Sequence, residues 1–438
     1  MVENSRRRTA CGLAAALAAL ALVGSPASAE IETRIYTSDD TLLRLGSYAF
    51  EGGETLTLTV GIGSGATRHP SDPPNMIWTI GDRGPNIACD EMKATAGIEP
   101  AGCREVKSGR VYPTPSYTPS IYRVMLLDDG TFRVTDVMTL KDRTGRPLNG
   151  MPNPLRTATT ETPLDGQARP LKQDVHGVDA ECLIRLSDGT FWIGDENAPS
   201  LMHFSADGRM LARHVPRGTE GEFAGARYDV TGTLPAILVK RQANRGIEAC
   251  AASPDERFLY FVMQNPLANP NPVAYRQAKN TRLYKIERAT MQVVGEWVYA
   301  LDDPQSFRRD PSDKQNDPRL SEMLAIGPDR LVVLERTEKT TKLYEVALSD
   351  DTKIDMGKWD DAATRPTLEQ VDAQAVGIKP LAKTLRFDSF DFPDIVGKTE
   401  GMALLGDGSL LIINDDDFGI NGARTQIVVL RGTGIARR

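Results

Sequence analysis

The sequence has few of the side chains that usually bind zinc. Its 438 residues include four histidines and five cysteines. The histidines, at positions 69, 176, 203 and 214, show no metal-ligand spacing, and no two cysteines have the spacing of a zinc site. These shortages argue against a zinc centre.

The sequence also lacks an excess of basic residues. It has 52 Lys and Arg against 59 Asp and Glu, which gives a formal net charge of −7. Proteins that bind nucleic acid through its phosphate backbone need a basic surface, and no basic stripe is present in the sequence. We therefore expect no nucleic-acid partner, whereas the acidic balance is compatible with binding cations.

Several catalytic motifs are missing. The glycines at 61, 63 and 65 flank Ser64 without forming a G-x-S-x-G nucleophile elbow, and no Walker loop is present. The segment that follows these glycines, residues 67–74, has no helical pattern, which argues against a dinucleotide-binding fingerprint. The sequence therefore favours neither a serine hydrolase of the elbow type nor a nucleotide-binding protein.

Long apolar runs are absent after the first 30 residues. Arginines at 6–8 precede an apolar run at 13–23, and small residues at 27–29 follow it. This pattern predicts a cleavable signal peptide at 1–29, because a membrane anchor needs roughly 20 apolar residues. We expect cleavage after Ala29 and a periplasmic or secreted mature protein that is not inserted in a membrane. The consecutive arginines leave Sec and twin-arginine export both open.

The mature region contains an internal repeat. Four segments begin with or near Glu and continue with an alternating apolar run, a turn, a second apolar run and a polar or acidic end. They start at Asp179, Ile247, Ser321 and Thr399, and a fifth segment of the same shape starts at Gly63. This pattern is typical of a β-hairpin whose turn fixes the register.

The repeated hairpins predict an all-β fold. Helical periodicity is scarce, and sheets of about four strands arranged around an axis, as in a β-propeller, would account for the spacing. We predict one domain over residues 30–438 with six blades, and five or seven blades also fit the pattern. The strand-like segments at 32–37 and 425–432 could share a blade and close the ring. Long surface loops are predicted at 85–120, 143–175, 302–320 and 350–368.

Hairpin geometry gathers polar residues at one rim. Antiparallel pairing about the turn returns both ends of each hairpin to the side remote from that turn. If the blades are equivalent, all these ends face the same rim. The candidates near the hairpin starts are Glu181, Glu248, Glu322 and Glu400, and those at the hairpin ends are Asp82, Asp195, Glu196, Glu335, Asp415 and Asp416.

Carboxylates gathered in this way predict a metal site. They repel one another and would raise each other's pKa unless cations occupy the site. Oxygen ligands of this kind suit calcium, which takes about six to eight of them. The alternative is that each Glu orders its blade through hydrogen bonds to the backbone.

Four cysteines lie in the mature region. Cys89 and Cys103 could close a short loop in an oxidising compartment, with a stabilisation of roughly 3 kcal/mol on the chain-entropy model. Cys182 and Cys250 lie in apolar strand-like runs, where they could instead be buried unpaired thiols. The sequence leaves both pairings open.

Several motifs together resemble a known family. The segments are DRGPN at 82–86, AECLIRLSDGTFWIGDENAPSL at 180–201, NRGIEACAASPDERFLY at 244–260, LVVLERT at 331–337 and KTEGMALLGDGSLLIINDDDFG at 398–419. They resemble the phytase-like family of bacterial exported proteins known as esterase-like activity of phytase, and more distantly the six-bladed propeller phytases. The resemblance covers roughly residues 40–432. It implies calcium ions that are held by channel carboxylates, bind a substrate phosphate and activate a water.

The resemblance also implies roles for individual residues. The positions that match the Glu-Gly and acidic-end motif best, and would be calcium ligands, are Glu181, Asp195, Glu196, Glu400, Asp415 and Asp416. Arg83 would bind phosphate, and Lys398 and Arg245 would place cations beside the metal. The chain departs from the family motif in lacking a glycine after Glu181 and after Glu248.

Three functions are compatible with the sequence. The first is calcium-dependent hydrolysis of a phosphate ester by a phytase-like phosphatase or phosphodiesterase. The second is a calcium-dependent lactonase or esterase, and the third is a non-catalytic propeller that binds a ligand. Basic side chains facing the metal rim would favour phosphate esters, and a mostly apolar funnel would favour lactones. We expect a small-molecule substrate and a monomeric protein.

Overall fold

The structure of the protein is a computed structural model that describes residue 1 and residues 30–155 and 160–435. The predicted cleavage site after Ala29, with residues 2–29 of the predicted signal peptide, lies outside these ranges. Within them, no helix has both the length and the apolar character needed to cross a membrane.

Five sheets of four or five strands, which we call blades, make up most of the described chain. Blade 1 consists of β4 (Gly65–Thr67), β5 (Met76–Ile80), β8 (Ser120–Leu126) and β9 (Phe132–Thr139), and blade 2 of β11 (Ala180–Arg185), β12 (Phe191–Asp195), β13 (Ser200–Phe204), β14 (Met210–Pro216) and β15 (Asp229–Leu234). Blade 3 consists of β16 (Ile247–Ala252), β17 (Phe258–Met263), β18 (Asn280–Glu287) and β19 (Gln292–Ala300), and blade 4 of β20 (Arg319–Gly327), β21 (Arg330–Arg336), β22 (Thr341–Ala347) and β23 (Thr384–Asp388). Blade 5 consists of β24 (Thr399–Leu404), β25 (Leu410–Asn414), β26 (Ile427–Arg431) and β1 (Glu32–Tyr36). Neighbouring strands in these blades are antiparallel, except that β15 pairs parallel to β14.

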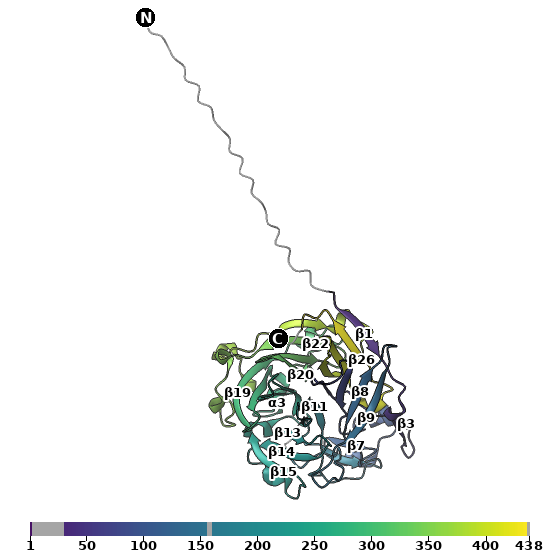
Figure 1. Cartoon of the computed structure of the whole chain (residues 1–438). Coiled ribbons are helices and arrows are strands. Elements are labelled where there is room, and N and C mark those ends of the chain that lie inside the picture. Colours follow the sequence, from purple (N-terminus) through teal and green to yellow (C-terminus); the bar gives the residue numbers. More distant parts are fainter. Residues whose placement is uncertain (2–29, 156–159, 436–438) are drawn as a thin grey trace.

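The first strands of the five blades form a closed ring. β4 contacts β11, β11 contacts β16, β16 contacts β20, β20 contacts β24, and β24 contacts β4 again. Figure 1 shows the sheets arranged around this ring, with the chain colours running once around it. The predicted all-β, propeller-type architecture is therefore present.

Blade 5 combines strands from both ends of the described chain. β1 pairs antiparallel with β26, from Glu32 opposite Arg431 to Tyr36 opposite Ile427. Main-chain hydrogen bonds between the first strand and the last thus close the ring, as the sequence predicted.

The described residues form five blades, and the prediction of six was wrong for this part of the chain. The five repeated hairpins are the first hairpins of the five blades. The hairpins between them, at 120–139 and 200–216, are outer strands of blades 1 and 2 and do not form a separate blade. The extra blade was predicted because a hairpin pattern does not distinguish an outer strand pair from the start of a new sheet.

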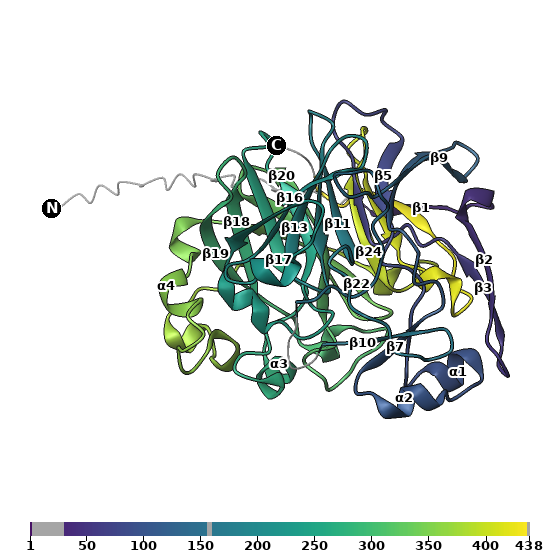
Figure 2. The same cartoon turned by 90° about the horizontal axis from the view of Figure 1, so that it is seen from below.

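The remaining elements lie outside the blades. β2 (Arg44–Ala49) and β3 (Thr55–Thr59) form a hairpin, and β6 (Ile87–Ala88), β7 (Gly109–Tyr112) and β10 (Thr162–Asp165) form a small sheet. The α-helices are α1 (Met92–Ala96), α2 (Ala101–Glu105), α3 (Pro272–Gln277) and α4 (Met356–Trp359). The 3-10 helices are η1 (Thr41–Leu43), η2 (Glu220–Phe223), η3 (Ala236–Lys240), η4 (Pro304–Ser306), η5 (Asp350–Thr352), η6 (Leu368–Gln370), η7 (Gln374–Val376), η8 (Ser389–Asp391) and η9 (Asp417–Gly419). Figure 2 shows α1, α2, α3, β7 and β10 on one side of the ring.

Apolar side chains fill the spaces between adjacent blades. One cluster joins blades 2 and 3 and includes Ile184, Trp192, Leu259 and Phe261. Comparable clusters lie between the other neighbouring blades. The inner strands are therefore apolar on both faces and read as nearly continuous apolar runs rather than as strict alternation.

Both cysteine pairs that the sequence left open are disulfides. Cys89 and Cys103, with their Cα atoms 5.3 Å apart, tie the insertion that carries α1 and α2. Cys182 and Cys250, with their Cα atoms 5.6 Å apart, join β11 of blade 2 to β16 of blade 3. The second bond therefore links two neighbouring blades at their inner strands.

Candidate functional site

A bulge near the start of the inner strand sets the direction of the repeated glutamates. In blade 5, Thr399 pairs with Asn414 and Gly401 with Ile413, which leaves Glu400 without a partner across the sheet. Blade 3 leaves Glu248 unpaired in the same way, and the register of blade 2 shifts at Glu181. Bulges of this kind turn a side chain out of the regular alternation of the strand. All three glutamates line one pocket at this end of the ring.

This pocket, which we call the site pocket, has a volume of about 370 Å³. Besides the inner-strand glutamates, it receives one residue from the end of each inner hairpin. By register these hairpin-end positions are equivalent in blades 2 to 5, where they are Glu196, Gln264, Arg336 and Asp415, and Asp82 follows the inner hairpin of blade 1. Residues Glu91 and Thr95, around α1, line its outer part.

Blade 4 departs from the repeat in a way that the sequence concealed. An additional bulge between Ala325 and Gly327 shifts its register by one residue, and the second bulge then falls at Ser321. Ser321 is therefore the equivalent of Glu248 and Glu400, and Glu322 is not. We predicted that Glu322 would lie at the rim; counting residues from the turn gave the wrong position because the extra bulge is not visible in the sequence.

Glu322 is buried against the backbone of neighbouring strands. Its Oε2 accepts a hydrogen bond from the Ala66 amide at 3.1 Å, and its Oε1 accepts one from the Met323 amide at 3.0 Å. It does not line the site pocket. The alternative considered for these glutamates, that they order the blades through backbone hydrogen bonds, describes Glu322.

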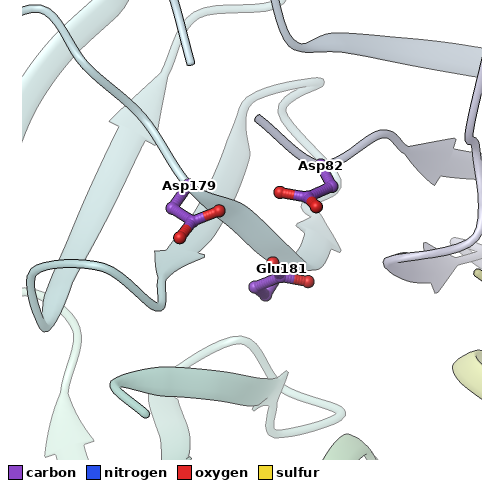
Figure 3. Close-up of side chains that lie close together, drawn as sticks. All are labelled: Asp82, Asp179 and Glu181. Carbon is purple, nitrogen blue, oxygen red and sulfur yellow. The ribbon is translucent and has the colours of Figure 1, made fainter. Parts of the chain in front are cut away.

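Two groups of carboxylates could hold a metal ion. Asp82, Asp179 and Glu181 form one group, and Glu181, Glu196 and Glu248 form the other. Within each group, one oxygen from each residue lies within 4.8 Å of the others. Glu181 belongs to both groups, and Figure 3 shows it below Asp82 and Asp179, whose carboxylates point toward each other.

Burial and mutual repulsion raise the pKa values in these groups. Burial is the main cause for Glu196, with Glu248 as the next, and the pKa of Glu196 rises to about 8. Burial raises the pKa of Asp179 and of Glu248 to about 7 each. It also raises the pKa of Asp82 and Glu181 well above the ordinary range, and neighbouring carboxylates add to the effect. Without a bound metal ion, the carboxylates of these two groups therefore hold protons at neutral pH.

The carboxylates on blade 5 have cations of the protein itself beside them. Arg336 of blade 4 pairs with Glu400 and also donates to Ser321 Oγ at 3.0 Å. Lys398 Nζ donates to Asp415 Oδ2 at 2.6 Å and also pairs with Asp417. In blade 5, two fixed positive charges thus offset part of the charge of three carboxylates.

Further cations surround the carboxylate groups. Arg83 Nη1 lies 2.8 Å from Glu161 and 3.2 Å from Asp179, and it is almost fully buried. Arg245 lies 3.2 Å from Glu196. The positively charged residues that line the site pocket are Arg83, Arg110, Arg245, Arg319, Arg336 and Lys398. The pocket therefore places basic side chains beside the carboxylates, including the three basic residues predicted from the sequence.

Three other predicted ligands, Asp195, Glu335 and Asp416, lie outside the site pocket. Asp195 is fully buried; it pairs with Arg213 and accepts hydrogen bonds from the amides of Ala198, at 2.8 Å, and Asp179, at 3.2 Å. Glu335 accepts hydrogen bonds from Lys383 at 2.8 Å and Tyr299 at 2.9 Å. Neither residue lines the site pocket, and the contacts of both lie within or between the blades, where they stabilise the fold.

Asp416 is likewise separated from the pocket, although its neighbours Asp415 and Asp417 line it. One oxygen of Asp416 accepts from the Phe418 amide at 3.1 Å, and the other accepts from Thr59 at 3.1 Å and Thr425 at 3.3 Å. These contacts start η9 and attach it to β3. Of the consecutive aspartates at 415–417, the middle one organises the turn.

Sequence reasoning missed Asp179, Glu161, Arg319 and Arg336. Asp179 comes two residues before Glu181, and the period of two along a strand could have indicated it. Arg336 directly follows Glu335 at the end of β21, where the repeat places acidic or amide residues in other blades. Glu161 and Arg319 lie in or beside long insertions, where no repeat marks them.

Part of the chain resembles a fungal protein. A protein of Arthroderma benhamiae, described as an uncharacterized secreted protein, is 28% identical over 138 residues, which are 28% of this chain and 27% of that protein. The matched region thus spans about a quarter of the relative's length.

Solved structures show only weak overall similarity. A luciferin-regenerating enzyme has a TM-score of 0.35 at 9% identity and covers 93% of this chain and 98% of its own. A streptogramin B lyase has a TM-score of 0.30 at 10% identity, covering 92% and 98%. The Dos1 propeller has a TM-score of 0.31 at 9% identity, covering 90% and 82%. Values this low carry no conclusion about this chain.

A family model, by contrast, matches most of the chain. The model is named phytase-like and described as esterase-like activity of phytase, and it matches residues 59–418. The matched region contains all five inner hairpins and every charged residue of the site pocket. The resemblance identified from the sequence motifs is thereby confirmed. The chain belongs to the phytase-like family described as esterase-like activity of phytase.

Proposed function

We propose that the protein is an exported, calcium-dependent hydrolase of phosphate esters. The observation that carries this proposal is the site pocket itself, where two groups of buried or half-buried carboxylates share Glu181, and where all of them except Asp179 line the pocket together with six basic side chains. Carboxylates of this kind suit calcium, and the basic side chains suit a phosphate group. Family membership supports a hydrolase.

The carboxylates fit a calcium ion in their chemistry. Oδ1 of Asp179 and Oε2 of Glu248 are buried oxygens that accept no hydrogen bond within the described part of the protein. Buried polar atoms are normally satisfied, and a cation would satisfy both of these. Asp82, Asp179 and Glu181 would hold one ion, and Glu181, Glu196 and Glu248 would hold a second.

The carboxylates and the basic side chains of the pocket would have different roles in binding a phosphate ester. Bound calcium would supply positive charge to the phosphate and make a nearby water more acidic. Arg245 and Arg319, which line the same pocket, would donate hydrogen bonds to phosphate oxygens and stabilise charge that develops there. Arg83 is held by Glu161 and Asp179, so its main role would be to orient these carboxylates rather than to bind the substrate directly. No covalent nucleophile is needed in this scheme.

Lactone hydrolysis is less well supported by the pocket. Its apolar lining is restricted to Ile87, Phe418 and Ile420, whereas a lactonase funnel would be mostly apolar. A non-catalytic propeller would use the same carboxylates for calcium that only stabilises the ring. We infer export to the periplasm or the medium from the signal-peptide pattern at 1–29.

The proposal is tested by assaying the mature protein, first stripped of metal with a chelator, on phytate, p-nitrophenyl phosphate and a lactone. We expect phosphate release that depends on added calcium and no opening of the lactone. Glu51→Gln, which changes an exposed carboxylate away from the pocket, is the control and should leave the rate unchanged. Phosphate release that ignores calcium would reject the proposed mechanism. Lactone opening alone would establish the second function, and calcium binding without turnover would establish the third.

A further inference from the structure

The second carboxylate group lies across the boundary between two blades. Glu181 and Glu196 belong to blade 2, and Glu248 belongs to blade 3. The sheets of the two blades are separate, so no ladder of main-chain hydrogen bonds fixes the distance between β11 and β16. Something other than strand pairing must therefore set the distance between Glu181 and Glu248.

At the pocket end, two glycines let the backbones of the two blades approach closely. A Cβ atom on Gly194 of β12 would lie 2.7 Å from Cys182 Sγ and 2.9 Å from the carbonyl oxygen of Ile247. A Cβ atom on Gly246 would lie 2.3 Å from the carbonyl oxygen of Glu196. All three distances are too short for a side chain, so the boundary is packed tightly where the carboxylates meet.

The Cys182–Cys250 disulfide crosses this boundary beside the carboxylates. Cys182 directly follows Glu181, and Cys250 comes two residues after Glu248. Both cysteines are buried. In the calcium-free protein the carboxylates repel one another, and a covalent bond one or two residues away opposes the separation of the strands that carry them.

We propose that Cys182 and Cys250 are positioning residues, whose bond holds Glu181 and Glu248 at the distance that a shared calcium ion requires. The proposal rests on the calcium site of the proposed function. Residues that orient metal ligands typically change the affinity for the metal by about 10- to 100-fold when they are removed. Loss of this disulfide should therefore weaken calcium binding even in a protein that remains folded.

The two blades have other contacts that would keep them together without the bond. At the opposite end of the strands, Glu256 of blade 3 accepts hydrogen bonds from the amide of Ser187, at 2.6 Å, and from its hydroxyl, at 2.7 Å. The apolar cluster between the blades also remains. The expected effect of breaking the disulfide is thus a local opening at the pocket end.

The second disulfide of the chain provides a matched control. We would measure the calcium dissociation constant by isothermal titration calorimetry and the melting temperature of the wild type, of C182A/C250A and of C89A/C103A. Both double variants should melt at a lower temperature, because each loses a cross-link. Only C182A/C250A should bind calcium about 10-fold or more weakly, whereas C89A/C103A should bind it like the wild type.

A second measurement covers the case in which C182A/C250A does not fold. In C89A/C103A, Cys182–Cys250 is the one disulfide left among the described residues. Prolonged treatment with a phosphine reductant, needed because the bond is buried, would open it alone, and thiol titration reports how much has opened. Calcium affinity should fall in proportion to the released thiols. Unchanged affinity in the folded C182A/C250A variant, or after reduction, would overturn this inference alone. A wild type that binds no calcium would overturn both this inference and the proposed function.

Discussion

The two halves of the site pocket use the same repeat positions for opposite purposes. In blades 2 and 3, the inner-strand and hairpin-end positions hold Glu181, Glu196 and Glu248, which crowd together and carry raised pKa values. In blades 4 and 5, the same positions include Arg336, whose guanidinium pairs with Glu400. Of the three glutamates in the first half, only Glu196 has a basic partner among the described residues, Arg245, whereas Glu400 and Asp415 in the second half are paired with Arg336 and Lys398.

This difference teaches that the repeat determines where a side chain lies and not what it does. Glu400, which Gly401 follows, matches the Glu-Gly motif of the family better than Glu181 does, yet burial next to Arg336 gives it a partner within the protein. Its pKa still rises to about 8, because burial outweighs the attraction of Arg336. Under the proposed function, Glu181, which has no arginine or lysine paired to it among the described residues, would therefore be the stronger metal ligand.

The largest expected effect comes from removing the built-in cation. Arg336→Gln leaves Glu400 buried without its partner, and breaking a buried ion pair in this way typically costs about 3–5 kcal/mol of unfolding free energy. Urea unfolding of the calcium-free protein measures it. The double variant R336Q/E400Q removes both charges and should recover most of the loss. Equal stability of R336Q and the wild type would show that blades 4 and 5 do not depend on this pair.

Glu181→Gln should have the next largest effect, on calcium affinity. Because Glu181 belongs to both carboxylate groups, we expect roughly 100-fold weaker calcium binding and the loss of calcium-dependent turnover. The calcium-free variant should be no less stable than the wild type, because one of several mutually repelling carboxylates is gone. Calorimetry and thermal melting test the two parts separately. A variant that binds calcium normally would assign Glu181 to a structural role.

A third effect is a pH dependence that distinguishes the two halves. Calcium must displace protons from Asp179, Glu196 and Glu248, whose pKa values are raised to about 7, 8 and 7. Calcium affinity should therefore rise about 10-fold or more between pH 6 and pH 8, with protons released on binding.

The same pKa values predict how the stability of the calcium-free protein changes. Between the unfolded pKa values and the raised folded ones, the folded state binds more protons than the unfolded state. Its unfolding free energy should therefore fall as pH rises from about 5 to 8. Saturating calcium should remove this decline. A calcium-free protein whose stability is flat over this range would contradict the crowding of carboxylates in blades 2 and 3.

The smallest expected effect on calcium binding is that of Glu322→Gln. Glu322 accepts backbone hydrogen bonds below the pocket, so the variant should keep wild-type calcium affinity while losing about 1–3 kcal/mol of stability, because an amide has one acceptor oxygen. Ser321→Glu, at the true repeat position, is the informative comparison, since it should place a new carboxylate beside Arg336. A marked loss of calcium binding in E322Q would show that Glu322 is a calcium ligand after all.

The sequence was sufficient to find the hairpins and most of the rim, because short apolar runs and turn residues are local signals. It located Glu181, Glu196, Glu248, Glu400 and Asp415 in one pocket together with Arg83, Arg245 and Lys398. It misplaced Glu322 because a bulge shifts register without any mark in the residue pattern. It also predicted Asp195 and Asp416 as metal ligands. Both carboxylates are instead paired within the protein, Asp195 with Arg213 and Asp416 with Thr59, and these tertiary contacts leave no local pattern in the sequence.

The pairing of β1 with β26 also constrains how the molecule assembles. These strands are the first and the last along the described chain, and Glu400 and Asp415 lie in the blade that they complete. During synthesis or translocation, blades 1 to 4 have all their strands before β26 emerges, while β1 remains without its partner. The part of the pocket that contains Glu400 and Asp415 therefore takes its place only in the final step of ring closure, and a chain cut before β26 would expose unpaired edges at both sides of the gap.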